Sequence, residues 1–228
     1  MNLGLKAPPS WGGRREGAGR PPGARPRIRH RTRETFPARY PCHVTLKVRK
    51  DVPSLRSERL VREVARSFSE ACSRGAFRVV QYSLQHDHAH LVVEANGPVA
   101  LGKGMASIGA RFARAVNRVF GRSGPVLADR YHVAVLRSPR QVRNALAYVL
   151  LNGRRHVAKA GRKLLGRGRV DPASSGAWFD GWRRGVRVPV GSGEPPVAAA
   201  HSWLLKAGWR RHRLLDPGEV PGGSGASP

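Results

Sequence analysis

The alternation of apolar and polar side chains divides the centre of this chain into seven elements. Residues 43–48 alternate with a period of two, which predicts a half-buried strand. Ser54 is a candidate N-cap for a helix whose apolar positions recur from Leu55 to Ala71 and stop before Gly75. The remaining pattern predicts a hairpin of strands 77–84 and 88–94, then a second helix over residues 100–120. A fourth strand follows over 130–136, and a third helix begins at a proline and covers 139–152.

The order strand, helix, strand, strand, helix, strand, helix predicts an α+β fold. It matches the ferredoxin-like split βαβ arrangement, a four-stranded antiparallel sheet with helices on one face and the other face available for a ligand. The last helix, which carries Tyr148, is an addition at the C-terminal end. We expect three segments: a basic disordered arm over residues 1–40, the layered domain over 41–165, and a Gly/Pro-rich extension containing tryptophans over 166–228.

The charge of the chain points to a polyanionic partner. Lys and Arg number 42 against 14 Asp and Glu, a net charge of +28 at pH 7. Residues 101–170 alone hold sixteen of the basic residues and a single acid, Asp129. Nucleic acid is therefore the first partner to consider, with an affinity that should fall steeply with salt. RNA-binding proteins share such a surface, so charge does not choose DNA over RNA.

Several arginines are candidates for contact with DNA. In the arm, residues 17–23 (GAGRPPG) resemble the centre of an AT-hook, in which an extended Arg enters the minor groove. A merely solvated basic tail explains this segment about as well. The arginines that we expect to contact DNA are Arg20, Arg118, Arg122, Arg130, Arg154 and Arg155.

Cysteine usage and hydropathy favour a cytoplasmic protein. Two cysteines exclude a disulfide-rich scaffold and a four-cysteine zinc site. The pair Arg14-Arg15 lacks the apolar segment that a twin-arginine export signal requires. The longest apolar stretch, near residues 197–205, is far shorter than the ~20 residues of a membrane helix. We therefore expect no membrane association beyond a weak attraction of the positive charge to anionic lipid.

Two histidines on the predicted strand 88–94 form a candidate metal site. Because side chains alternate along a strand, His88 and His90 project from one face while Ala89 and Leu91 face the other. Two neutral imidazoles aimed at one point can hold a divalent ion that polarises a phosphate. His86 is in phase by spacing but belongs to the turn. The alternative is a histidine-rich surface strand; the ion would be magnesium or manganese with mixed ligands, or zinc with soft ligands.

The last predicted helix presents a tyrosine away from its apolar side. Tyr148 lies roughly 145° from the centre of the aliphatic stripe at 100° per residue. Asn144 and Asn152, four residues on either side, share its face. A phenol can attack phosphorus and form a covalent phosphotyrosine when its charge is stabilised. The alternative is a tyrosine that bridges helix and sheet through its ring and hydroxyl.

The histidine strand together with the tyrosine helix resembles the HUH single-tyrosine transposases, most of all the REP-associated tyrosine transposases of bacteria. The segments that carry the resemblance are residues 82–94 (YSLQHDHAHLVVE), 110–131, which include NRVFGRSG and DRY, and the Tyr-x-x-x-Asn pair formed by Tyr148 and Asn152. It covers about residues 40–160. The family differs from this chain at three positions, where His86, Asp87 and Gly153 stand in place of the usual Pro, Asn and Pro.

This resemblance implies an enzyme that nicks and transfers single-stranded DNA, often folded as a hairpin, in the bacterial cytoplasm and nucleoid, with a homodimer as a candidate assembly. His88, His90 and Asn152 would hold Mg²⁺ or Mn²⁺, and Tyr148 would attack a phosphate to give a 5′-phosphotyrosine and a free 3′-OH. Two alternatives stay open. One is a non-catalytic, domesticated nucleic-acid-binding protein, and the other a rolling-circle replication initiator, which is less favoured because the sequence offers one suitable helix tyrosine.

Overall fold

A computed structural model describes residues 34–71, 73–159, 161, 166, 169–185, 188 and 190–221. The described residues from Glu34 onward belong to one compact unit. Arg20 and the AT-hook-like segment lie outside the described residues. Within the described part of the chain, no helix is both long and apolar enough to cross a membrane.

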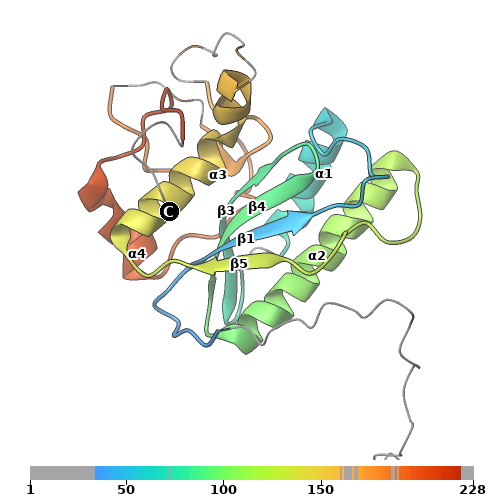
Figure 1. The fold of residues 1–228 in the computed structure, drawn as a ribbon, viewed down its shortest axis with the longest axis horizontal. Coiled ribbons are helices and arrows are strands. Elements are labelled where there is room, and N and C mark those ends of the chain that lie inside the picture. The colour runs from blue at the N-terminus through green and yellow to red at the C-terminus, as the bar shows by residue number, and fades with distance from the viewer. Residues whose placement is uncertain are drawn as a thin grey trace, which may run out of the picture. The chain divides into compact units, whose positions relative to one another are not determined.

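An antiparallel sheet forms the centre of the unit, and Figure 1 shows its strands side by side. The strand order is β2-β3-β4-β1-β5. The strands are β1 (Cys42–Lys47), the two-residue β2 (Ser73–Arg74), β3 (Phe77–Leu84), β4 (His88–Ala95) and β5 (His132–Val135). The long strands β3-β4-β1-β5 have the order of the split βαβ arrangement, because β1 and β3 both pair with β4 between them. The predicted α+β class with a four-stranded antiparallel sheet is confirmed, and β2 extends its edge.

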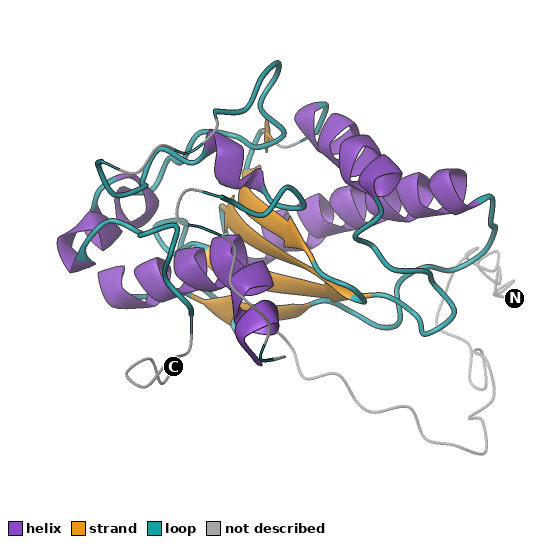
Figure 2. Ribbon diagram, turned by 90° about the horizontal axis from the view of Figure 1, so that it is seen from above, coloured by secondary structure: helices purple, strands orange, loops and turns teal. Residues whose placement is uncertain are grey.

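Helices cover both faces of the sheet. On β4, Ala89, Leu91 and Val93 belong to a core that includes residues of α1 (Glu58–Ser69) and α2 (Pro98–Phe120). Val92 points the other way and belongs to a second core with residues of α3 (Pro139–Lys159). Figure 2 shows the sheet between these two groups of helices. The face that the sequence left available for a ligand is therefore partly covered by α3.

Two helix boundaries differ from the sequence prediction. Ser57, rather than Ser54, caps α1, because its side chain accepts a hydrogen bond from the backbone N–H of Leu60. The last helix does not end near Asn152 but runs through Gly153 to Lys159.

Gly153 has a packing role in the middle of α3. A Cβ atom at position 153 would lie 2.5 Å from Oδ2 of Asp171. The Asp171 carboxylate accepts two hydrogen bonds from Arg56, both at 2.8 Å. The missing side chain thus makes room for an ion pair that ties the C-terminal residues to the sheet, since Arg56 also donates to the carbonyl of Leu84.

Much of the described C-terminal part, residues 169–185 and 190–221, packs on the same face as α3, while Ala173 and Val197 belong to the core on the other face. They include the short helices η1 (Ser175–Trp178), α4 (Trp203–Lys206) and η2 (Gly208–His212). Ser175 bonds to the backbone and side chains of β3, accepting from the N–H of Tyr82 at 2.8 Å and donating to Oε1 of Gln81 at 2.6 Å. The apolar residues that join α3 in the second core are Phe179, Leu204, Leu205, Trp209 and Leu215.

Candidate active site

His88 and His90 lie on the α3 face of β4, with their imidazoles turned toward each other. The two Nε2 atoms are 3.0 Å apart, and the ring centroids are 4.6 Å apart. His90 is 4% exposed, so almost none of its ring meets solvent. The alternation of β4 produces this arrangement, since the intervening Ala89 is buried in the core on the opposite face.

The outer nitrogen of each ring has a partner on a neighbouring residue. Nδ1 of His90 lies 3.1 Å from Oγ1 of Thr45 and 3.2 Å from Nε2 of His43. Both partners come from β1, where Thr45 is directly opposite His90 in the antiparallel register. Nδ1 of His88 lies 2.7 Å from Oδ1 of Asp87. These contacts orient both rings so that each Nε2 faces the other histidine.

Burial keeps two of these imidazoles neutral near pH 7. It lowers the pKa of His90 to about 3, with the charges of His43, His88, His156 and Arg155 acting in the same direction. Burial likewise lowers the pKa of His43 to about 4. The hydrogen bond with His88 lowers the pKa of Asp87, which therefore remains a carboxylate. A neutral imidazole keeps the lone pair that a metal ion needs.

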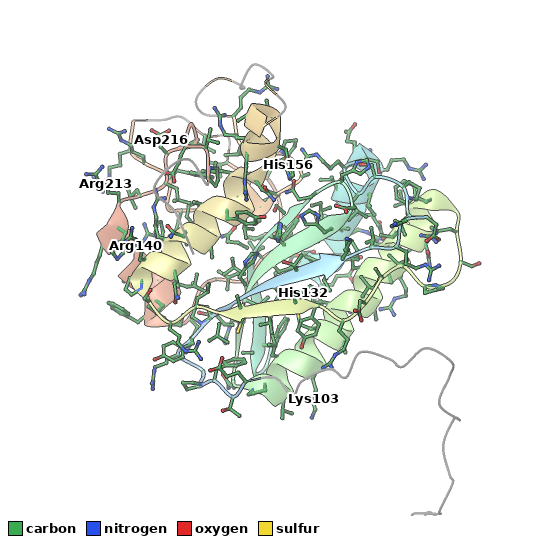
Figure 3. The ribbon with its side chains drawn as sticks, viewed as in Figure 1. Lys103, His132, Arg140, His156, Arg213 and Asp216 are labelled. Carbon is green, nitrogen blue, oxygen red and sulfur yellow. The ribbon has the colours of Figure 1, made fainter. Side chains whose placement is uncertain are left out.

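Tyr148 joins the histidines from above the sheet. It lies in the middle of α3, half-buried, with its ring centroid 5.0 Å from that of His90 and 5.7 Å from that of His43. The guanidinium carbon of Arg155 is 5.2 Å from the centre of the tyrosine ring. Figure 3 shows α3 alongside the sheet, with His156 toward its C-terminal end. One cation and two imidazoles therefore surround a single phenol.

Asn152, one helical turn beyond Tyr148, is buried with its polar atoms unused. Its side chain is 1% exposed. Neither Oδ1 nor Nδ2 has a hydrogen-bond partner within the described part of the chain. A buried carboxamide without partners is costly, so its place on the tyrosine face of α3 calls for a ligand.

The donor set of this cluster fits a divalent cation. Two ligands of an octahedral ion at ~2.1 Å are about 3 Å apart when adjacent, which is the separation of the two Nε2 atoms. Among the described residues, no three His, Cys, Asp or Glu side chains are gathered as a metal site. The carboxamide oxygen of Asn152 is a further hard donor of the kind that Mg²⁺ and Mn²⁺ accept.

The predicted DNA-contacting arginines are spread over the molecule. Arg118 lies on α2, across the sheet from Tyr148, and is ion-paired with Glu63; Arg122, just after α2, is ion-paired with Asp51 at 2.7 Å. Arg130 is exposed in the loop before β5. Arg154 is buried, and its guanidinium lies 3.5 Å from the carbonyl oxygen of Gly166. Of the described members of this set, Arg155 is the one in contact with the Tyr148 ring.

Sequence reasoning missed the contribution of β1. His43 and Thr45 are two residues apart on a strand, so their spacing already placed them on one face. The sequence held no signal that this face adjoins His90, because the pairing of β1 with β4 joins residues about 45 positions apart.

Comparison with known proteins shows the family. The sequence model of the family described as IS200-like transposase matches residues 36–149, half of the chain. The chain belongs to the IS200-like transposase family. The matched segment of this transposase contains His88, His90 and Tyr148 and ends before Asn152. The resemblance to tyrosine transposases expected from the sequence is confirmed at this level.

One solved structure similar to this transposase is that of a REP-associated tyrosine transposase bound to a REP hairpin. The two chains are 13% identical and superimpose with a TM-score of 0.43, over 59% of this chain and 75% of the other. No curated protein sequence matches the chain.

Proposed function

We propose that this transposase cuts and rejoins single-stranded DNA, with Tyr148 as the nucleophile. The observation that carries the proposal is the 5.0 Å contact between the Tyr148 ring and His90, within one chain. A structural tyrosine would not need a pair of convergent imidazoles and an unpartnered carboxamide beside it. The arrangement supplies instead the parts of a phosphoryl-transfer site: a nucleophile, a cation and ligands for a metal ion.

The reaction exchanges one phosphorus–oxygen bond for another. The hydroxyl of Tyr148 gives up its proton, and the phenolic oxygen attacks the phosphorus of a DNA phosphodiester and forms a tyrosyl–phosphate bond. The bond from phosphorus to the 3′ oxygen breaks, and that oxygen takes up a proton to become a free 3′-OH. The products are a 5′-phosphotyrosine and a strand end that can re-attack it, which is how strands are joined.

Each neighbour of the tyrosine has a defined task. Arg155 stabilises the negative charge of the phenolate and of the phosphate that it attacks. His43 and Thr45 hold the ring of His90, and Asp87 holds that of His88. His88, His90 and Asn152 would hold Mg²⁺ or Mn²⁺. When bound, that ion supplies Lewis-acid polarisation of a phosphate oxygen.

The charge of the chain supports DNA as the substrate. With a net charge of +28, the protein attracts a polyanion over long range. Cutting by a tyrosine requires a strand that can reach the site between α3 and the sheet, which favours unpaired DNA or the unpaired part of a hairpin. This agrees with what the resemblance implies.

The experiment is the covalent capture of DNA by the full chain. Wild-type protein is incubated with a labelled hairpin oligonucleotide that carries single-stranded flanks, in the presence of Mn²⁺, and run on a denaturing gel. A shifted band is expected for wild type and for the control Tyr131→Phe, and none for Tyr148→Phe, although its affinity for the oligonucleotide should persist. An undiminished adduct in Tyr148→Phe would refute the role. Binding without any adduct across varied substrates would make the chain a non-catalytic nucleic-acid-binding protein.

A further inference from the structure

An exposed tryptophan stands on the C-terminal part of the chain, beyond the segment that matches the family. Trp203 is the first residue of α4 and is 52% exposed. Among the described residues, Val99 and Val190 are the other large apolar side chains so exposed. Indole rings are usually mostly buried, so a half-open one on a polar surface points to a binding role.

The backbone that carries Trp203 is firmly held. The buried carboxylate of Glu94 accepts hydrogen bonds from the backbone N–H groups of His201 and Ser202, at 2.8 and 2.6 Å. Leu204 and Leu205, which follow Trp203, are buried in the core shared with α3. These contacts fix the start of α4 on the sheet.

The indole ring itself is also held in place by its neighbours. A Cβ atom at Gly208 would lie 2.7 Å from the six-membered ring of Trp203, so the glycine backbone packs directly against the indole. The guanidinium carbon of Arg211 is 5.0 Å from the centre of the ring. Trp203 is therefore open to solvent and yet preorganised, which lowers the entropy lost when a flat ligand stacks on it.

Basic residues without an acidic partner follow Trp203 along the chain, and one of them, Arg211, lies over its ring. Within the described residues, Lys206, Arg211 and Arg213 make no ion pair, and the nearby Asp180 is engaged by Arg210 at 2.8 Å. Arg140, in the first turn of α3, is likewise unpaired there, and Figure 3 shows it at the same end of the molecule as Arg213. Like charges in such number repel a second copy of this chain and attract phosphates.

We infer that Trp203 and Arg211 form a stacking platform for an unpaired base of the DNA substrate. An aromatic ring with an unpaired arginine beside it suits a single strand, because every base has a face that can stack and a phosphate on each side. The inference rests on the proposed DNA substrate and names a second contact for it, outside the tyrosine site. The platform would hold the single-stranded flank of a hairpin and leave its duplex part uncontacted.

Binding measurements on an uncleaved substrate test this platform. In the full-length Tyr148→Phe protein, fluorescence anisotropy compares a hairpin that carries a single-stranded tail with the same hairpin without the tail. Trp203→Ala should weaken binding of the tailed hairpin about 10-fold, since one base–aromatic stack contributes about 1–3 kcal/mol. Binding of the blunt hairpin should not change. Trp203→Phe should keep most of the tail affinity, and Val99→Ala, an exposed apolar control, should keep all of it.

A scan of abasic nucleotides along the tail gives a second measurement. One position should lose affinity when its base is removed, and this loss should vanish in Trp203→Ala. Equal affinity of Trp203→Ala and its parent for the tailed hairpin would overturn the inference. It would also be overturned if Trp203→Ala changed the self-association of the protein and left tail binding intact. Adduct formation is measured separately, in a Trp203→Ala protein that keeps Tyr148. An adduct without tail dependence rejects only the platform, and tail dependence without an adduct rejects only the proposed chemistry.

Discussion

Replacing Asn152 by leucine is expected to make the metal-free protein more stable. The side chain is 1% exposed, and both of its polar atoms lack a hydrogen-bond partner within the described residues. Leaving a buried amide unsatisfied costs about 1–3 kcal/mol, whereas an apolar side chain of similar shape carries no such cost. A gain of about 2 kcal/mol in a chain of this size corresponds to a rise in Tm of roughly 4–8 °C.

The same substitution should remove stabilisation by metal. If Asn152 is a ligand, Mn²⁺ at 100 times its Kd stabilises the wild-type fold by about 2.7 kcal/mol, and the variant should gain much less. Thermal unfolding is followed with EDTA and then with Mn²⁺. The expected result is a crossing: the variant is the more stable protein without metal and the less stable one with it.

Asn144→Leu serves as the matched control for this experiment. Asn144 lies one turn before Tyr148 on the same helix face but is only half-buried, so its amide reaches water and its replacement should change neither measurement much. A lower Tm of Asn152→Leu in EDTA would show that the carboxamide has partners in the folded state. That outcome would remove the argument for Asn152 as a ligand.

Two further substitutions probe the assembly and the orientation of the site. A mixture of Tyr148→Phe with His90→Ala should form no DNA adduct, because tyrosine and histidine meet within one chain at 5.0 Å; recovery of the adduct on the denaturing gel would show a site shared between two copies. His43→Ala should weaken Mn²⁺ binding about 10-fold by titration calorimetry, since the partner of a ligand's outer nitrogen is lost. His43→Gln, which can still bond to Nδ1 of His90, should restore most of that affinity, and equal affinities of all three proteins would contradict the positioning role.

Local patterns were sufficient to define the elements and to orient their side chains. Strand periodicity placed His88 and His90 together, and helical phase placed Tyr148 with Asn152, as the structure shows. The end of α3 could not be predicted in this way, because Gly153 is accommodated by the distant Asp171 rather than by its neighbours. The short helices that follow were missed, since their backbone is held by contacts with β3 and β4.

Predictions that depended on contacts between distant segments of the chain were less complete. The sequence offered Arg118 and Arg122 as DNA contacts, yet in the structure they form ion pairs with Glu63 and Asp51 from other parts of the chain. The contribution of His43 was invisible for the same reason. An ion pair or a ring contact depends on which segments fold next to each other, and no spacing along the chain records that.

The sequence by itself therefore determined the succession of strands and helices, the family resemblance and the direction in which each candidate side chain leaves its own element. These follow from backbone periods of two and 3.6 residues, which act over a few neighbouring positions. Only the tertiary structure decided that α3 lies on the histidine face of the sheet, that β1 adds His43 to the cluster, and that Trp203 stays open to solvent. Those outcomes come from strand pairing and core packing between segments tens of residues apart, where burial of apolar surface, and not local periodicity, selects the neighbour.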